Sequence, residues 1–303
     1  MSAVATSYPN YPKSPKQRHH SLVNPLLRFG MSNPQIVPTQ TVSESNSDTF
    51  TFTRSSNLTQ QIQAKLVVIQ QVIRPQGVSS AFEQQVKQLL LKKVPTPILS
   101  RLAQQGFTLD LKHHITANQP EKENTQFYLN ERGGLYEPAR KTTTVAENVH
   151  QLKTQPPIWI ENQYWQNSVI HELGHVIADD LGQKVAQEMP FDHPDKKRLE
   201  AWGLSEHAIF RQAWEKDYQS MPNSFKNQES PIAYYLQDHQ QVPFGVGRQE
   251  TFAECVDILL RGSGSTYNFQ AFSQHFPNTL NATKTLLEQG FDIKLSWPLI
   301  LQE

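Results

Sequence analysis

The feature that most constrains this chain is the segment VIHELGHV at residues 169–176. In an α-helix, residues four apart lie on the same face, so a helix here presents His171 and His175 side by side. Apolar residues recur around the two histidines, which favours burial of the rest of the helix: Val169, Ile170, Leu173, Val176 and Ile177. We expect a helix over about 163–181 that ends at Gly182.

Two imidazoles at this spacing, with a glutamate after the first, form the HExxH pattern of zinc hydrolases. Glu172 can then reach a water molecule on the metal and act as a general base. Alternatively, both histidines are partly buried structural side chains. The extended pattern with a third histidine is absent, because Ala178 and Leu181 occupy the positions of its glycine and its last histidine. This excludes a metzincin and leaves an acidic residue on a later helix as the third ligand.

The segment RQETFAECVDILLRG, residues 248–262, predicts such a helix, with Gly262 at its end. Glu250 and Glu254 lie four residues apart on one face, and the other faces carry apolar side chains. Carboxylates are seldom buried unpaired, so we expect a cation and the N–H of a ligand imidazole as their partners. The alternative is a solvated acidic face at a helix N-terminus, where negative charge also suits the helix dipole.

Composition and charge argue against several other classes of protein. The 28 basic and 28 acidic side chains balance, which gives no indication of nucleic acid or an anionic membrane as a partner. The single cysteine, Cys255, cannot form an internal disulfide. No apolar run approaches the roughly 20 residues that span a bilayer, and the first residues lack the apolar core of a standard secretory signal. We expect a soluble monomer, cytoplasmic by default, although export by a route without such a signal stays open.

The chain divides into a tail and one domain. Residues 1–60 are rich in Pro, Ser, Thr, Asn and Gln, so we expect a disordered tail in which TFTFTR (49–54) is the one candidate strand. Residues 61–303 are expected to form the folded domain. Its hydrophobic pattern predicts strands over 65–73, 107–112 and 139–147, further helices over 79–94, 97–105 and 269–290, and helical pieces around 196–219.

Three of these segments carry specific signals. Residues 65–73 are rich in β-branched side chains and end at a turn, although their apolar spacing also suits a helix. Ser80, followed by Glu83, predicts a capping box at the start of the helix over 79–94. Gly133 and Gly134 together predict a turn before the last strand.

At this point two segments resemble those of a known family. HELGHVIADD followed by QETFAECVDILL is similar to the catalytic domain of anthrax lethal factor and its relatives, the secreted Pro-Pro endopeptidases, over roughly residues 64–291. The resemblance implies an α+β, zincin-like metalloprotease domain of the gluzincin type. Such a domain has a small mixed sheet, the HExxH helix and a C-terminal helical part that carries the third zinc ligand. One Zn2+ per chain and a peptide or protein substrate are implied with it.

In that family the later helix bears the motif E-x-F-A-E, whose first glutamate binds zinc and whose second supports the site. Carried over to this chain, Glu250 is the third ligand beside His171 and His175. Glu254 then fixes a ligand imidazole without touching the metal. Asp179, four residues after His175, is a further candidate for that role, and a solvent-facing helix end is the alternative.

The chain departs from the family in two ways. Glu250 follows His175 by 250 − 175 = 75 residues, which is longer than the family's spacing and implies an insertion at about 183–243. The second departure concerns the oxyanion. The family's tyrosine, which donates a hydrogen bond to it, has no counterpart here, because Pro243 stands at its position. Tyr235 or Tyr234 would take the role if this loop folds back, and a packing or surface position is the alternative. Loss of one such donor typically lowers the rate by roughly 10²–10³.

These features predict a zinc-dependent endopeptidase in which Glu172 takes a proton from the attacking water. We expect residues 141–147 of the predicted strand to be the sheet edge to which an extended substrate adds, at Thr143, Thr144 and Val145, while a purely structural strand is the alternative. Two other functions stay open. One is a zinc-binding interaction module with weakened catalysis, and the other is a toxin or effector domain delivered to another cell.

Overall fold

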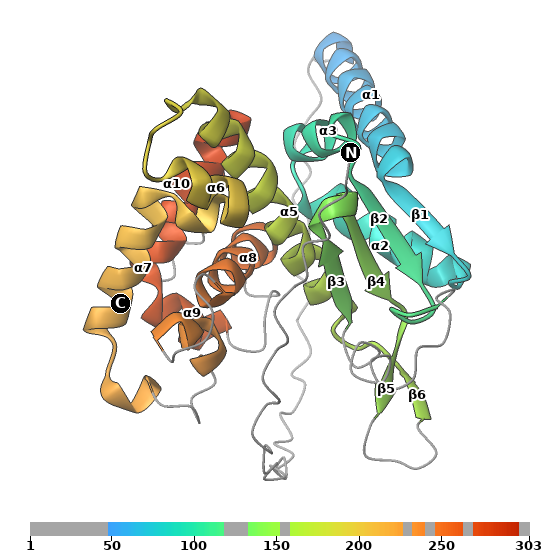
Figure 1. Ribbon diagram of the computed structural model, residues 1–303. Helices are drawn as coiled ribbons and strands as arrows, with labels where there is room; N and C mark the ends of the chain where they lie inside the picture. The colour runs from blue at the N-terminus through green and yellow to red at the C-terminus, as the bar shows by residue number, and fades with distance from the viewer. Residues whose placement is uncertain are drawn as a thin grey trace, which may run out of the picture. The chain divides into compact units, whose positions relative to one another are not determined.

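The computed structural model describes residues 48–117, 133–151, 158–226, 232–239, 246–262 and 269–296. In this part of the chain the fold is α+β, mostly helical with a small mixed sheet, as predicted (Figure 1). None of the helices that the structure describes is long and apolar enough to cross a membrane.

The first half of the fold holds the sheet. Its strands run in the order β1-β2-β4-β3, with β1, β2 and β4 parallel and β3 antiparallel to β4. A separate ribbon of two antiparallel strands, β5 and β6, follows. The elements are α1 (Asp48–Val72), β1 (Ile73–Gln76), α2 (Ser80–Lys93), α3 (Thr96–Gln104), β2 (Thr108–Lys112), β3 (Gly134–Glu137), β4 (Thr142–Ala146), β5 (Asn148–Gln151) and β6 (Ile158–Glu161).

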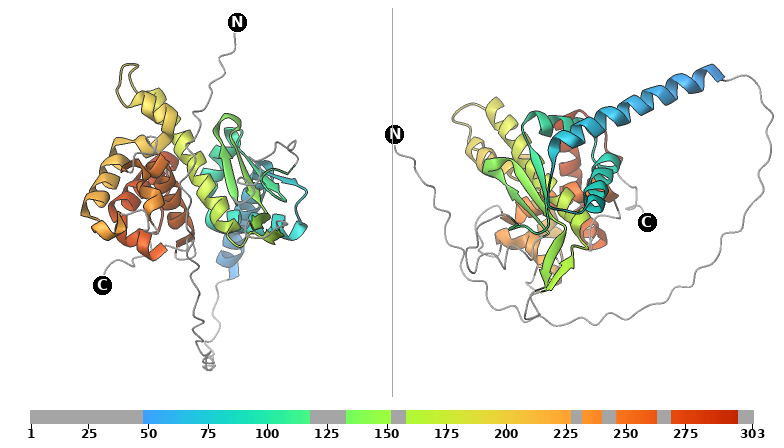
Figure 2. Two further views of the ribbon diagram at one scale, coloured as in Figure 1. Left: turned by 60° about the horizontal axis from the view of Figure 1, so that its bottom comes forward. Right: turned by 90° about the vertical axis from the view of Figure 1, so that its right-hand side faces the viewer.

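The second half is helical, and α5 lies between it and the sheet in Figure 1 and in the left view of Figure 2. The helix α5 contacts β3 and β4 on one side and α6 and α8 on the other. The α-helices are α5 (Trp165–Glu188), α6 (Lys196–Trp202), α7 (Ala208–Ser220), α8 (Val246–Arg261), α9 (Phe269–His275) and α10 (Pro277–Phe291). Two short 3₁₀ helices, η2 (Gly203–Glu206) and η4 (Ala233–His239), pack against α8.

The predicted apolar stripe of α5 is buried at all five positions. Around Val169 and Leu173 it meets apolar side chains from the sheet half: Val72, Leu90, Leu99, Phe107 and Leu109. Full burial of one such side chain contributes about 1.5–3 kcal/mol, so the stripe fixes the rotation of α5 about its own axis. That rotation decides where the histidines of the same helix point.

Most of the predicted elements are present near their expected bounds. The segments 79–94 and 97–105 form α2 and α3, the segment 107–112 contains β2, and the closing segment 269–290 forms α9 and α10. The cap of α2 differs by one residue from the prediction. The hydroxyl of Ser79, rather than Ser80, accepts a hydrogen bond from the N–H of Phe82 at 3.1 Å.

The strand predicted over 65–73 is wrong, because these residues form the last turns of α1 and β1 begins only at Ile73. Ile69 and Val72 are buried on one helical face, where the neighbouring helices α2 and α3 cover them. The same helix runs through 49–54, the candidate lone strand, and past residue 60, the expected end of the disordered tail. Residues 1–47 of that tail lie outside the described residues.

The predicted end of α5 at Gly182 is also wrong, since the helix continues to Glu188. A Cβ atom built on Gly182 would lie 2.4 Å from the Cα atom of Gly203. The glycine is therefore needed for the close approach of the turn between α6 and η2, and it does not act as a helix stop.

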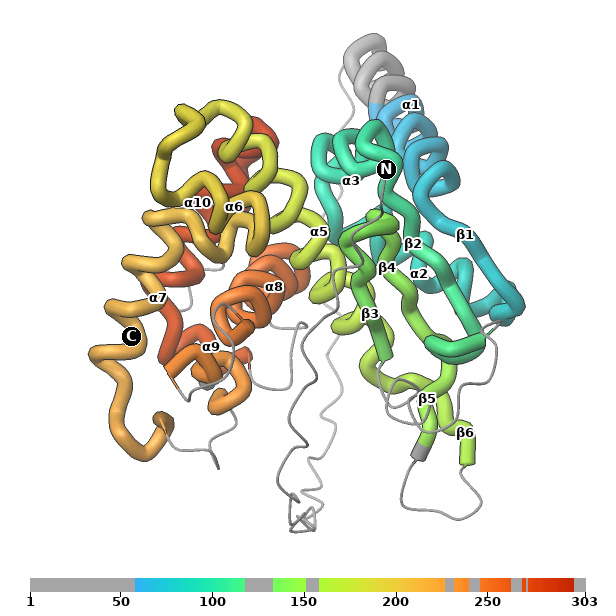
Figure 3. The backbone as a smooth tube through the Cα atoms, in the orientation of Figure 1, coloured from blue at the N-terminus to red at the C-terminus, as the bar shows by residue number. Residues whose placement is uncertain are grey.

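The edge strands of the sheet are β1 and β3, and not the strand predicted over 139–147. That segment forms β4, which pairs with β2 on one side and β3 on the other. Its residues Thr143, Thr144 and Val145 are buried inside the sheet. The segment GLYE, which follows the first glycine of the predicted turn, pairs with β4 from outside and becomes the edge, as the trace in Figure 3 shows.

Candidate metal centre

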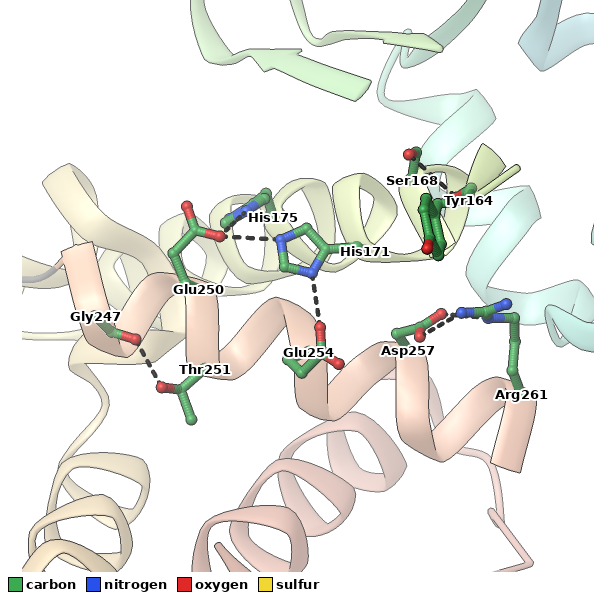
Figure 4. Close-up of polar contacts among 10 residues, drawn as sticks. All are labelled: Tyr164, Ser168, His171, His175, Gly247, Glu250, Thr251, Glu254, Asp257 and Arg261. Carbon is green, nitrogen blue, oxygen red and sulfur yellow. Dashed lines mark hydrogen bonds and ion pairs between the residues drawn. The ribbon is translucent and has the colours of Figure 1, made fainter. Parts of the chain in front are cut away.

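The centre forms where α5 and α8 cross in close contact (Figure 4). A Cβ atom built on Gly174 would lie 2.6 Å from the Cα atom and 2.9 Å from the carbonyl oxygen of Ala253. Glycine and alanine at this crossing let the two backbones approach. The approach brings the histidine face of α5 against the acidic face of α8.

Three side chains converge at this crossing. The Nε2 atoms of His171 and His175 lie 3.0 Å and 3.7 Å from Oε2 of Glu250. One ligand atom from each residue lies within 4.8 Å of the other two, and no other such cluster occurs in the described part of the chain. Tetrahedral ligands about 2.1 Å from an ion lie roughly 3.4 Å from one another, so these separations fit zinc. Two imidazoles and a carboxylate are also a donor set that zinc accepts.

The histidines and the carboxylates of this cluster shift the pKa values of one another. Burial lowers the pKa of His171, but hydrogen bonds with Glu250 and Glu254 oppose this effect, and the net pKa lies well above the ordinary value. Burial raises the pKa of Glu250, but interactions with His175 and His171 bring it well below the ordinary value. The carboxylate is thus held as an anion, which is the form that binds a metal ion.

Glu254 lies behind His171, on the side away from Glu250. Its Oε2 atom is 3.2 Å from Nδ1 of His171, and its side chain is only 3 % exposed. The charge of this carboxylate also acts on the hydroxyl of Tyr235 and raises its pKa, together with burial. With Nδ1 as the donor to Glu254, Nε2 of His171 is left for a metal, which is the contact that the family resemblance implied.

Glu172 lies between α5 and the edge strand β3. A Cβ atom built on Gly134 would lie 2.7 Å from Cγ and 3.1 Å from Oε1 of Glu172. The lack of a side chain at Gly134 therefore gives this glutamate its room. The sequence predicted only a turn at this glycine, and the pair Gly133-Gly134 next to a predicted strand was the available signal of a close approach.

Asp179 binds the sheet instead of an imidazole. Its carboxylate accepts hydrogen bonds from the hydroxyl of Tyr136 in β3 at 2.9 Å and from Nε2 of Gln183 at 3.0 Å. Burial and the charge of Asp179 raise the pKa of Tyr136, so the hydroxyl remains a donor. The structure therefore does not bring Asp179 into the role proposed for it beside His175, and this contact ties β3 to α5.

The two candidate oxyanion tyrosines lie in η4. Tyr234 is half exposed. The ring of Tyr235 packs edge-on against Phe272, with centroids 5.0 Å apart. Burial and the charge of Glu254 raise the pKa of Tyr235. Pro243, at the position of the family's tyrosine, lies outside the described residues.

Sequence reasoning had no place for Gly174 as a structural residue. It was treated only as part of the HExxH pattern, although a glycine inside a helix is a signal of close packing. Ala253, its partner in the crossing, carried no signal that a single sequence could supply.

A scan against protein-family models found no match, and no curated protein matched the sequence. The residues and their geometry therefore carry what can be said about function.

Proposed function

We propose that this chain is a zinc-dependent endopeptidase with a zincin-like fold of the lethal factor type. The observation that carries the proposal is the convergence of His171, His175 and Glu250 where α5 crosses α8. Zinc bound there would polarise the scissile carbonyl and lower the pKa of a water molecule. This chemistry needs a base beside the metal ligands, and the HExxH pattern supplies one in Glu172.

In the proposed mechanism Glu172 accepts a proton from the attacking water and passes it to the leaving amine. Its position next to His171 in the chain, with its side chain along Gly134 of β3, supports this role. Glu254 holds the imidazole of His171 through Nδ1, so that Nε2 stays directed toward the position where the metal would bind.

We propose that the substrate adds to β3. As an edge strand, β3 has main-chain groups on its outer side that an extended peptide can pair with. Gly134 and Tyr136 of this strand contact Glu172 and Asp179 of α5. A peptide that pairs with β3 would therefore run along the helix that carries the base. This replaces the earlier assignment of the substrate strand to β4.

One observation favours the alternative, a zinc-binding module with weakened catalysis. Tyr235 packs edge-on against Phe272 and the charge of Glu254 acts on its hydroxyl, so we infer that it does not serve as the oxyanion donor of the family. If no other group takes this role, the rate falls by roughly 10²–10³. Glu172 argues for retained activity, because a site that only binds zinc has no use for a general base.

The test is digestion of a diverse peptide library, read by mass spectrometry, with the native protein and the Glu172→Gln variant. Both proteins are loaded with zinc, and their zinc content is measured. We expect equal zinc content and cuts made only by the native protein. Equal zinc content without cuts by either protein would favour the binding module, and the same cuts by both would exclude Glu172 as the base.

A further inference from the structure

Two aspartates follow the histidines on α5, and both hold the sheet half of the fold. Asp179 accepts a hydrogen bond from the hydroxyl of Tyr136 in β3 at 2.9 Å and another from Nε2 of Gln183 at 3.0 Å. The next residue, Asp180, forms an ion pair with Nε of Arg101 in α3. The helix that carries the histidines is therefore tied to β3 and α3 by charged side chains as well as by its apolar stripe.

The contact with Asp179 acts on an edge strand. Within the described residues only β4 pairs with the main chain of β3, and β3 lies on the side of the sheet that faces α5 and α8 in Figure 1. Gly134, at the start of β3, lies against Glu172, and Tyr136 reaches Asp179, which is 179 − 172 = 7 residues further along α5. Seven residues of helix span about 10.5 Å. Two contacts at this separation fix the direction in which β3 runs along α5.

The hydrogen bond is strong enough to matter for so short a strand. β3 has four residues, Gly134–Glu137, so its pairing with β4 supplies few main-chain bonds. The ring of Tyr136 is partly buried against the core, and its hydroxyl donates to a carboxylate. A hydrogen bond to an ionised acceptor is roughly twice as strong as one between neutral groups. Loss of this contact would leave β3 free to shift or tilt relative to α5.

We propose that Tyr136 and Asp179 are positioning residues for the peptide substrate. Their hydrogen bond anchors β3 on α5, and β3 in turn places the peptide that pairs with it beside Glu172. The inference deepens the proposed function and rests on it for the nature of the substrate. The contact acts on the binding of the peptide and leaves the affinity for zinc unchanged, because it involves none of the three candidate ligands.

Three variants of this contact predict different results. Tyr136→Phe removes the hydroxyl and keeps the ring, and Asp179→Ala removes the acceptor. Hydrogen bonds to charged groups shift an equilibrium roughly tenfold or more, so we expect either change to raise KM roughly tenfold. Asp179→Asn retains a carbonyl oxygen as acceptor and should keep KM near the native value. The matched control is Tyr218→Phe, because Tyr218 is also partly buried against the core but lies in α7.

The experiment measures KM and kcat for one peptide that the native protein cleaves, and zinc affinity by competition with a chelator. A variant that only folds less completely would lower kcat and leave KM unchanged. We expect raised KM and native zinc affinity in Tyr136→Phe, with little further change when Asp179→Ala is added, because both break one contact. A native KM in Tyr136→Phe, or an equal rise in Tyr218→Phe, overturns the proposal.

Hydrogen exchange read by mass spectrometry tests the anchor without zinc or peptide. Fragments that contain β3 should exchange roughly tenfold faster in Tyr136→Phe than in the native protein, and fragments from α10 should not change. Equal exchange of β3 in the two proteins overturns the proposal. Native protein that cuts no peptide would refute the proposed function and the role in substrate binding, whereas faster exchange of β3 would still establish the contact as the anchor of this strand.

Discussion

Replacement of Gly174 by alanine tests the crossing of α5 and α8 on which the metal centre depends. The new methyl group would lie 2.6 Å from Cα and 2.9 Å from the carbonyl oxygen of Ala253, whereas ordinary contacts are 3.4–4 Å. Both obstacles are backbone atoms, which cannot rotate away as a side chain can. The two helices must therefore separate locally by about 0.8 Å.

The magnitude follows from two opposing effects. Overpacking costs about 1–3 kcal/mol, and a clash with backbone belongs at the upper end of that range. Alanine returns about 1 kcal/mol, because it is a better helix former than glycine. We expect a net loss of about 2 kcal/mol in the free energy of unfolding, which lowers the melting temperature by roughly 4–8 °C in a domain of this size. Metal sites tolerate deviations of only about 0.2 Å in ligand distance, so zinc affinity falls as well.

The assay is thermal and denaturant unfolding without zinc, followed by zinc competition on the folded variant. Gly290→Ala is the matched control, because Gly290 also lies in a helix. Its new methyl group meets only side-chain atoms of Leu181, the nearest at 2.6 Å. The side chain of Leu181 can change its conformation, so Gly290→Ala should lose less stability than Gly174→Ala. It should bind zinc as tightly as the native protein. A Gly174→Ala variant with native stability and native zinc affinity would refute the close crossing.

Two further predictions concern the pH dependence of zinc binding and the position of Glu172, the proposed base. Zinc must displace the proton of His171, whose pKa is raised well above its ordinary value, while Glu250 stays ionised because its pKa is lowered. Zinc affinity should therefore fall by up to about tenfold per pH unit as the pH drops below the pKa of His171. A chelator titration measures this affinity at several pH values. An affinity that stays constant or rises on acidification would contradict the prediction. Gly134→Ala should displace Glu172 and lower kcat by roughly 10²-fold, with zinc affinity retained. The control is Gly133→Ala, whose methyl group meets Ser168 and Asn162 instead, and it should affect cleavage less. Equal kcat values for the two variants would show that Gly134 does not determine the position of Glu172.

The sequence was most informative where the structure depends on local spacing. His171, Glu172 and His175 share two turns of one helix, so their arrangement follows from helical geometry alone. Glu250 lies on a different helix, and its place beside the histidines depends on how α5 and α8 cross. The family resemblance identified it, and periodicity could not.

Errors in the predicted fold have the same physical origin. The segment GLYE is too short to show a pattern of its own, and it becomes the edge strand only by pairing with β4. Glycine is typical of helix ends, but the turn at Gly203 packs on Gly182 and α5 continues past it. Residues 65–73 suited both a strand and a helix, and burial of Ile69 and Val72 by neighbouring helices decided for the helix. In each case contacts distant in sequence decided the outcome.

The central claim is that α5 and α8 together hold zinc. The most direct measurement is anomalous diffraction at the zinc absorption edge from crystals of the protein grown with one equivalent of zinc. We expect one strong peak about 2.0–2.2 Å from Nε2 of His171, Nε2 of His175 and a carboxylate oxygen of Glu250. A peak bound by other residues, or no peak at this crossing, would contradict the claim.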